Sequence, residues 1–147
     1  VEGKRVVVLG AGGAARAVGY ALRDRAERTW LLNRSAGRAE VVVRDLGGTL
    51  QIGGPKCLHE CELIVNCTSA GLHEGDSPIP DDWIPEGAQL YDLIYNPAVT
   101  RLMRVVVERG GRAVNGLGML VRQAAASFRI WTGIEPPLPV MFEAARA

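Results

Sequence analysis

The chain has 147 residues, of which 48% are hydrophobic and 22% are charged, which is typical of one folded domain and excludes a disordered chain. Its 17 basic and 16 acidic residues give a formal net charge of +1. The chain therefore lacks a general attraction for nucleic acid or for an acidic membrane surface, and we expect a small-molecule partner.

Short apolar runs alternate with helical patterns along the chain, and glycine or polar residues separate them. This alternation predicts an α/β fold, doubly wound, with a mainly parallel sheet and helices on both faces. The predicted elements, in chain order, are a strand at 5–9, a helix at 14–26, a strand at 29–32, a helix at 35–46, a strand at 49–52, a helical turn at 57–61, a strand at 63–66, a surface loop at 73–87, a strand at 89–93, a helix at 100–109, a strand at 112–114, a helix at 119–131 and a last short helix after Pro136 and Pro137.

Two of these helices carry specific expectations. The first is alanine-rich and should bury the face that holds Val18, Ala21 and Leu22. Ser35 should cap the second helix, which ends before a pair of glycines.

The segment between the first strand and the first helix fits the pattern G-x-G-x-x-G/A. Gly10 permits a tight turn, Gly12 lets the backbone approach a pyrophosphate, and Ala15 allows close packing of helix on strand. The helix then offers free amides to the phosphates. We therefore predict a Rossmann-like, nucleotide-binding domain over residues 1–147, the alternative being a purely structural turn. The loop residues expected to contact the nucleotide are Gly10, Ala11, Gly12, Gly13, Ala14 and Ala15.

The end of the second predicted strand decides which nucleotide is favoured. Proteins that bind NAD place an acid there, whereas this chain has Asn33, Arg34 and Ser35, with Arg38 one helical turn further on. A guanidinium pairs with a 2′-phosphate, and such a charged hydrogen bond contributes about 1.5–3 kcal/mol. We therefore predict NADP(H) as the cofactor; the alternative is that both arginines belong to a solvated helix face.

Five segments in the same order resemble the C-terminal NADP-binding domain of shikimate dehydrogenase. Two of them are the glycine loop and the Asn33 to Ala39 segment already described. The others are N-C-T-S-A-G at 66–71, which has Cys67 where the family usually has alanine, D-L-I-Y-N-P at 92–97 continuing to Thr100 and Leu102, and a stretch from 115 to 133. The resemblance covers essentially the whole chain.

The resemblance implies roles for further residues. It places Thr68, Ser69, Leu93, Gly116 and Met119 against the cofactor, the last two near its nicotinamide. It also implies that Tyr95 lies on the substrate side of the cleft and that Gln123 hydrogen-bonds a hydroxyl of shikimate. From the residues alone, Thr68 and Ser69 could equally form a polar turn, Gln123 could be a surface residue, and Asp92 could be structural or line the site.

The groups that would move a proton are not found in the sequence. The family is understood to use a Lys and an Asp from its N-terminal domain, in motifs N-x-T-x-P-x-K and G-x-N-T-D, and neither motif occurs here. Lys4 and Lys56 are the only lysines, and neither is expected to reach a substrate carbonyl. We therefore predict no catalytic residue in this chain and expect a domain or fragment of an enzyme that interconverts 3-dehydroshikimate and shikimate.

Two other functions remain open at this point. The chain could be a free-standing NADP(H)-binding module, or the cofactor domain of a quinate/shikimate dehydrogenase. The last helices, at about 119–147, are expected to pack toward the absent substrate domain. Without that domain they should expose Phe128, Ile130, Trp131 and Met141 and favour self-association.

Location and metal content follow from simpler signals. No apolar run reaches the roughly 18 residues that span a bilayer, and no signal peptide is visible, so we expect a cytoplasmic protein without a membrane partner. Three cysteines without a CxxC pair argue against a disulfide framework. Cys57, His59 and Cys61 lie close together in sequence but lack a fourth ligand, so no metal site is predicted.

Overall fold

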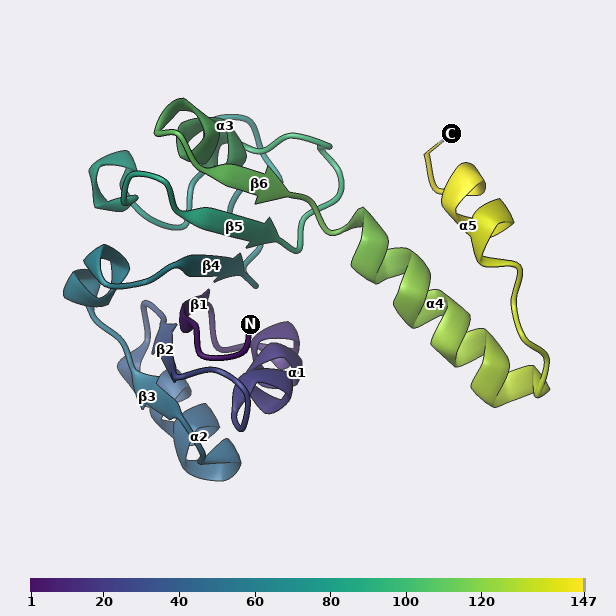
Figure 1. The fold of residues 1–147 in the computed structure, drawn as a ribbon, viewed down its shortest axis with the longest axis horizontal. Helices are drawn as coiled ribbons and strands as arrows, with labels where there is room; N and C mark the ends of the chain where they lie inside the picture. Colours follow the sequence, from purple (N-terminus) through teal and green to yellow (C-terminus); the bar gives the residue numbers. More distant parts are fainter. Residues whose placement is uncertain (147) are drawn as a thin grey trace.

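A computed structural model describes residues 1–146 of the chain as a single parallel sheet with helices on both faces (Figure 1). All five strand pairs are parallel, and the spatial order is β3-β2-β1-β4-β5-β6. The strands are β1 (Arg5–Leu9), β2 (Arg28–Leu32), β3 (Leu50–Ile52), β4 (Leu63–Asn66), β5 (Gln89–Asp92) and β6 (Arg112–Val114). The helices are α1 (Gly13–Leu22), α2 (Ala36–Leu46), α3 (Arg101–Glu108), α4 (Leu117–Thr132) and α5 (Leu138–Ala144), with short 3-10 helices η1 (Pro55–His59) and η2 (Asp81–Trp83).

The central strand β1 is buried on both sides because its side chains alternate between two cores. Val6 and Val8 pack with α1 and α2, whereas Val7 and Leu9 pack with α3 and the 3-10 helices. The α/β fold, the mainly parallel sheet and the helices on both faces are therefore confirmed.

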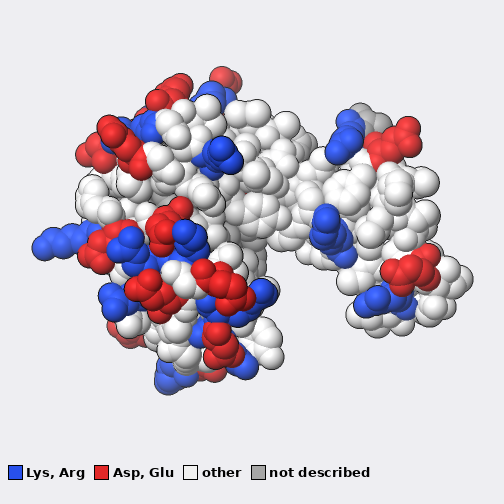
Figure 2. Space-filling model, viewed as in Figure 1, with Lys and Arg blue, Asp and Glu red and all other residues white. Residues whose placement is uncertain are grey.

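The last two helices form an arm that leaves the sheet and turns back on itself (Figure 1). Within α4, Val121 and Ala125 are buried, and the guanidinium of Arg122 lies 5.4 Å from the ring centre of Phe142 in α5. On the face seen in Figure 2, this arm is mostly uncharged, whereas charged side chains are spread over the sheet-containing part. We call residues 117–146 the C-terminal arm.

Several predicted boundaries were wrong. The first helix ends at Leu22 rather than at residue 26, because Arg25 and Ala26 both donate their amides to the Leu22 carbonyl and turn the chain into β2. Its buried face holds Ala15, Gly19 and Leu22, while Ala21 is exposed.

Smaller differences occur further along the chain. The turn predicted at 57–61 is the 3-10 helix at 55–59, which begins at a proline, and a second 3-10 helix lies within the predicted loop 73–87. The fourth α-helix begins two residues before its predicted start, directly after Gly116.

Candidate functional site

The predicted cofactor residues before residue 94 lie in the loops that follow the carboxyl ends of the strands or, for Gly13 to Ala15, in the first turn of α1. Because the sheet is parallel throughout, the ends of β1, β2, β4 and β5 share one edge. Ligands of doubly wound folds bind at this edge, where the strand order reverses. Here β1 lies between β2 and β4, so the reversal occurs directly after β1, at the glycine loop.

Gly10 is held in a conformation that side chains rarely adopt. Its φ is +106°, and a Cβ at this position would lie 3.1 Å from Cγ2 of Thr68 and 3.3 Å from the carbonyl oxygen of Cys67. The Gly10 amide donates to the Leu32 carbonyl at 2.9 Å. Gly10 therefore brings the loop after β1 against the loop after β4.

Gly12 and Gly13 face open space instead. A Cβ built on either residue would meet no atom within 4 Å, so their glycine character serves neither turn geometry nor internal packing. Gly12 occupies the N-cap position of α1, and no side chain caps the free amides there. Ala15 is fully buried and packs α1 against the sheet, as predicted. The backbone of this helix start is thus open to a ligand such as a pyrophosphate.

The turn after β2 is shaped by Asn33 and presents two arginines. The Asn33 side chain donates from Nδ2 to the Ser35 carbonyl at 2.9 Å. Arg34 and Arg38 are exposed, and within residues 1–146 neither makes an ion pair or a side-chain hydrogen bond. Ser35 occupies the N-cap position of α2, but its side chain makes no capping hydrogen bond, so its predicted capping role was wrong.

A buried polar network holds the loops after β4 and β5. Asn66 donates from Nδ2 to Asp92 at 2.9 Å, and the hydroxyl of Thr100 donates to the other Asp92 oxygen at 2.7 Å. The Ile94 amide also donates to Asp92, at 3.1 Å. Asn66 and Asp92 are fully buried and Thr100 is 2% exposed, so this carboxyl group belongs to the scaffold beneath the site.

Burial raises the pKa of the Asp92 carboxyl, although the hydrogen bonds from Thr100, Ile94 and Asn66 act in the opposite direction. The sequence left open whether Asp92 is structural, and the network favours the structural role. The sequence shows that Asn66 and Asp92 are polar residues at strand ends, but only the strand register shows that they pair.

Thr68 takes part in the same network, while Ser69 is exposed. The Thr68 hydroxyl donates to Oδ1 of Asn66 at 2.8 Å and accepts from the Ala70 amide at 3.1 Å. The polar turn that the sequence allowed as an alternative is therefore present. The exposed Ser69 side chain remains accessible beside it.

Gly116 and Leu93 lie in direct contact where the chain crosses from β6 to α4. A Cβ on Gly116 would collide with the Leu93 carbonyl oxygen, and the Gly116 amide donates to the Ile94 carbonyl at 3.0 Å. The close approach of these two backbone segments is therefore enough to explain why position 116 is a glycine. Met119 is half-buried in the first turn of α4.

The two residues expected on the substrate side are both exposed. Tyr95, 46% exposed, follows β5, and Gln123 lies on α4. Within the described residues, no hydrogen bond ties either side chain to another group. Both side chains are therefore accessible to a ligand, and neither has a hydrogen-bond partner among the described residues that would give it a structural role.

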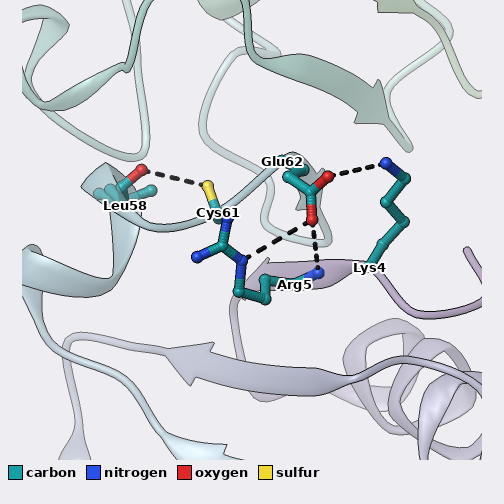
Figure 3. A network of polar contacts seen from close by, with 5 residues as sticks. All are labelled: Lys4, Arg5, Leu58, Cys61 and Glu62. Atoms are coloured by element: carbon teal, nitrogen blue, oxygen red, sulfur yellow. Dashed lines mark hydrogen bonds and ion pairs between the residues drawn. The ribbon is translucent and has the colours of Figure 1, made fainter.

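The two lysines occupy different places, and Lys4 lies at the opposite edge of the sheet. Lys4 precedes β1 at its amino end and pairs with Glu62 at 2.7 Å, and the Arg5 amide donates to the second Glu62 oxygen at 3.2 Å (Figure 3). The Lys4 ammonium and then the Arg5 amide lower the pKa of Glu62. Lys56 is exposed in η1, on the chain before β4.

The cysteines show no sign of reactivity. Burial raises the pKa of Cys57 to about 11 and that of Cys61 and Cys67 to about 12, so the thiols stay protonated near neutral pH. The Cys61 thiol donates a hydrogen bond to the Leu58 carbonyl oxygen at 3.2 Å (Figure 3). In residues 1–146, His, Cys, Asp and Glu nowhere gather in a group of three that could hold a metal ion.

A cavity of about 430 Å³ opens on the outer side of the same edge, between the loop after β4 and the start of α3. It includes Gly71, His73, Asn96, Arg101 and Arg104 in its wall. It shares no residue with the glycine loop or with the Arg34 turn, so it is separate from the expected nucleotide site. Over the part of the chain that the structure describes, no helix is both long and apolar enough to cross a membrane.

Comparison with known proteins identifies relatives over nearly the whole chain. The family model for the C-terminal domain of shikimate 5′-dehydrogenase matches residues 116–146. A shikimate dehydrogenase (NADP(+)) from Thermus thermophilus is 42% identical over 141 residues, which cover 95% of this chain and 53% of that protein. The chain thus spans about half the length of the curated relatives it matches.

Solved structures agree with this result. A Thermus thermophilus shikimate 5-dehydrogenase in complex with NADP(H) and shikimate has a TM-score of 0.86 at 39% identity, covering 97% of this chain and 54% of that one. A shikimate dehydrogenase in complex with NADP⁺ also has a TM-score of 0.86, at 31% identity, covering 99% of this chain and 54% of that one.

Proposed function

We propose that this chain, which belongs to the shikimate dehydrogenase family as its C-terminal domain, binds NADP(H) and forms the cofactor side of an active site that interconverts 3-dehydroshikimate and shikimate. One observation carries the proposal. The open backbone of Gly12 and Gly13 at the start of α1 occurs together with two arginines, Arg34 and Arg38, that have no partner within residues 1–146. The first feature suits a pyrophosphate, and the second suits a 2′-phosphate.

The glycine loop and the β2 turn would hold the phosphate groups. The backbone of Gly10 to Ala15 would approach the pyrophosphate, with the positive end of α1 directed at it. Asn33 fixes the turn through its bond to Ser35, so the arginine that follows starts from a defined backbone. Arg34 and Arg38 would pair with the 2′-phosphate, and no acid stands at the end of β2 to repel it.

Leu93, Gly116, Met119, Thr68 and Ser69 would bound the nicotinamide end. The contact between Gly116 and Leu93 would form the base of this part of the site, and Met119 can offer an apolar surface to the nicotinamide ring. Thr68 would contribute mainly through its turn, because its hydroxyl is already engaged, whereas Ser69 would contribute a free hydroxyl.

When bound, the cofactor supplies the hydride that reduces a ketone or accepts it from an alcohol. This chain's own residues would orient the reactants. Tyr95 and Gln123 would hydrogen-bond substrate hydroxyl groups from one wall of the cleft. The proton for the developing alkoxide would come from the half of the protein that this chain does not include, since Lys4 is paired at the opposite edge.

We also propose that the C-terminal arm packs against that other half. Phe128, Ile130 and Trp131 are 39%, 78% and 82% exposed, which is costly for side chains of this type, while Met141 is half-buried rather than exposed. In isolation, the same arm would favour self-association. A cytoplasmic location is supported by the three unpaired thiols among the described residues.

A titration with both cofactors tests the assignment. Arg34→Ala should weaken NADPH binding about 10- to 100-fold and change NADH binding by less than about twofold, because the charged hydrogen bond exists only with the 2′-phosphate. Arg112 on β6 is also exposed, so Arg112→Ala is the matched control and should change neither affinity. Equal weakening of NADPH and NADH by Arg34→Ala would contradict the proposal.

A further inference from the structure

The free edge of the sheet at β6 carries an apolar groove that the proposed function does not use. Figure 1 shows β6 as the outermost strand with α3 beside it. The groove has a volume of about 300 Å³, and its wall is formed by Val99, Met103, Arg104, Val107, Glu108 and Ala113. None of these residues belongs to the glycine loop, the Arg34 turn or the C-terminal arm.

An apolar stripe runs along α3 at this edge. Met103 and Val107 lie one helical turn apart on one side of α3, and Val99, which precedes the Thr100 N-cap, lines the same groove. Val99 is 51% exposed and Val107 is 58% exposed, although both lie beside a sheet edge that has no further strand. Apolar side chains aligned beside an unpaired strand mark a surface where another chain can add contacts.

Two opposite charges flank this stripe. Arg104 and Glu108 are one helical turn apart on α3, and within residues 1–146 neither forms an ion pair. A two-fold axis through the groove would set two copies of α3 antiparallel. Arg104 of each copy would then face Glu108 of the other, so both pairs would form at once. The surface is therefore complementary to itself in charge as well as in apolar character.

We propose that this groove is the contact surface of a two-fold symmetric dimer, with a second copy of this chain as its occupant. Val107 of each copy would enter the groove of the other, and the Arg104 and Glu108 pairs would flank it. Apart from Val99 and Ala113, this surface comes from the single short helix α3, so we expect a small interface and a weak, micromolar dimer. The proposal does not depend on cofactor binding.

Sedimentation equilibrium of the purified chain over a range of concentrations tests the dimer. Val107→Asp should raise its dissociation constant at least about tenfold, because a charge would enter the apolar groove. Ile130→Ser with Trp131→Ser, on the C-terminal arm, is the control that removes the other exposed apolar surface and should leave this dimer intact. An unchanged unfolding midpoint shows that each variant is folded.

Charge reversal distinguishes this two-fold dimer from nonspecific hydrophobic association. Arg104→Glu alone and Glu108→Arg alone should each weaken the dimer, because each creates two like-charge pairs across the axis. The double variant should restore the wild-type dissociation constant, since it exchanges the two charges. A monomer at all concentrations, a dimer lost only with the arm variant, or a double variant no better than the single ones would each overturn the proposal.

Discussion

The side-chain amide of Asn66 donates a 2.9 Å hydrogen bond to the carboxyl group of Asp92, and so joins the carboxyl ends of β4 and β5. Thr100 adds the start of α3 to the same carboxyl group at 2.7 Å. The loops that carry Thr68, Ser69 and Tyr95 begin at these two strand ends. One fully buried carboxyl group therefore positions both loops.

We expect Asp92→Asn to change how stability depends on pH. Burial raises the pKa of Asp92 above its ordinary value of 3.8, so the folded protein holds this proton more tightly than the unfolded chain. The contribution of this group is therefore greatest below the unfolded pKa and is lost as pH rises through the folded pKa. The amide of the variant does not titrate.

Urea unfolding at a series of pH values measures this effect. The free energy of unfolding of the wild type should fall relative to that of the variant as pH rises above about 4. Asp82→Asn, at an exposed position in η2, should give a curve that runs parallel to the wild type under the same conditions. Parallel curves for Asp92→Asn as well would show that the buried carboxyl does not titrate differently in the folded state.

The sequence predicted the strands better than the helix ends, for a physical reason. β1, β4 and β6 match their predicted bounds, and β1 and β4 are short apolar runs buried on both faces. The end of α1 at Leu22 depends on where the chain must turn to enter β2, which is a tertiary constraint. The high helix propensity of this alanine-rich segment therefore predicts a helix that is longer than the one in the structure.

Gly116→Ala should destabilise the chain. The added methyl group collides with the Leu93 carbonyl oxygen, and relieving that overlap costs about 1–3 kcal/mol. Gly118→Ala is the matched control two residues along, where a Cβ meets nothing within 4 Å, and its effect should stay within about 1 kcal/mol. Chemical denaturation compares the two variants. Equal midpoints would mean that the backbone at Gly116 and Leu93 can move apart without lowering the free energy of unfolding.

Gly12→Val separates cofactor binding from folding. The φ of Gly12 is −88°, which any residue adopts, and its Cβ position is empty, so the loss of stability should stay near the cost of a poorer N-cap residue, about 1 kcal/mol. The same side chain would occupy the space that the pyrophosphate needs, and NADPH affinity should fall more than about tenfold. Fluorescence titration with NADPH measures the affinity, and unchanged binding would place the nucleotide elsewhere.

The difference between local sequence patterns and tertiary constraints also decides which parts of the site could be predicted. The glycine loop and the arginine turn are local sequence patterns, and the structure places both at the edge where β1, β2 and β4 end. The reason for Gly116 could not be predicted, because its obstacle, the Leu93 carbonyl, lies 23 positions earlier in the sequence. The Asn66 and Asp92 pair likewise required the strand register.

The isolated chain should bind NADPH without turning over shikimate. Lys4 is held by Glu62 at the amino end of β1, and the three thiols stay protonated, so none of these four groups is placed to exchange a proton with a substrate alkoxide. With shikimate and NADP⁺ added, absorbance at the NADPH band should not rise, while the same preparation still binds NADPH. A Gly12→Val preparation is the negative control for binding. Turnover above the protein-free background would show that residues 1–146 contain a proton-transfer group, with Tyr95→Phe and His73→Gln as the first variants to locate it.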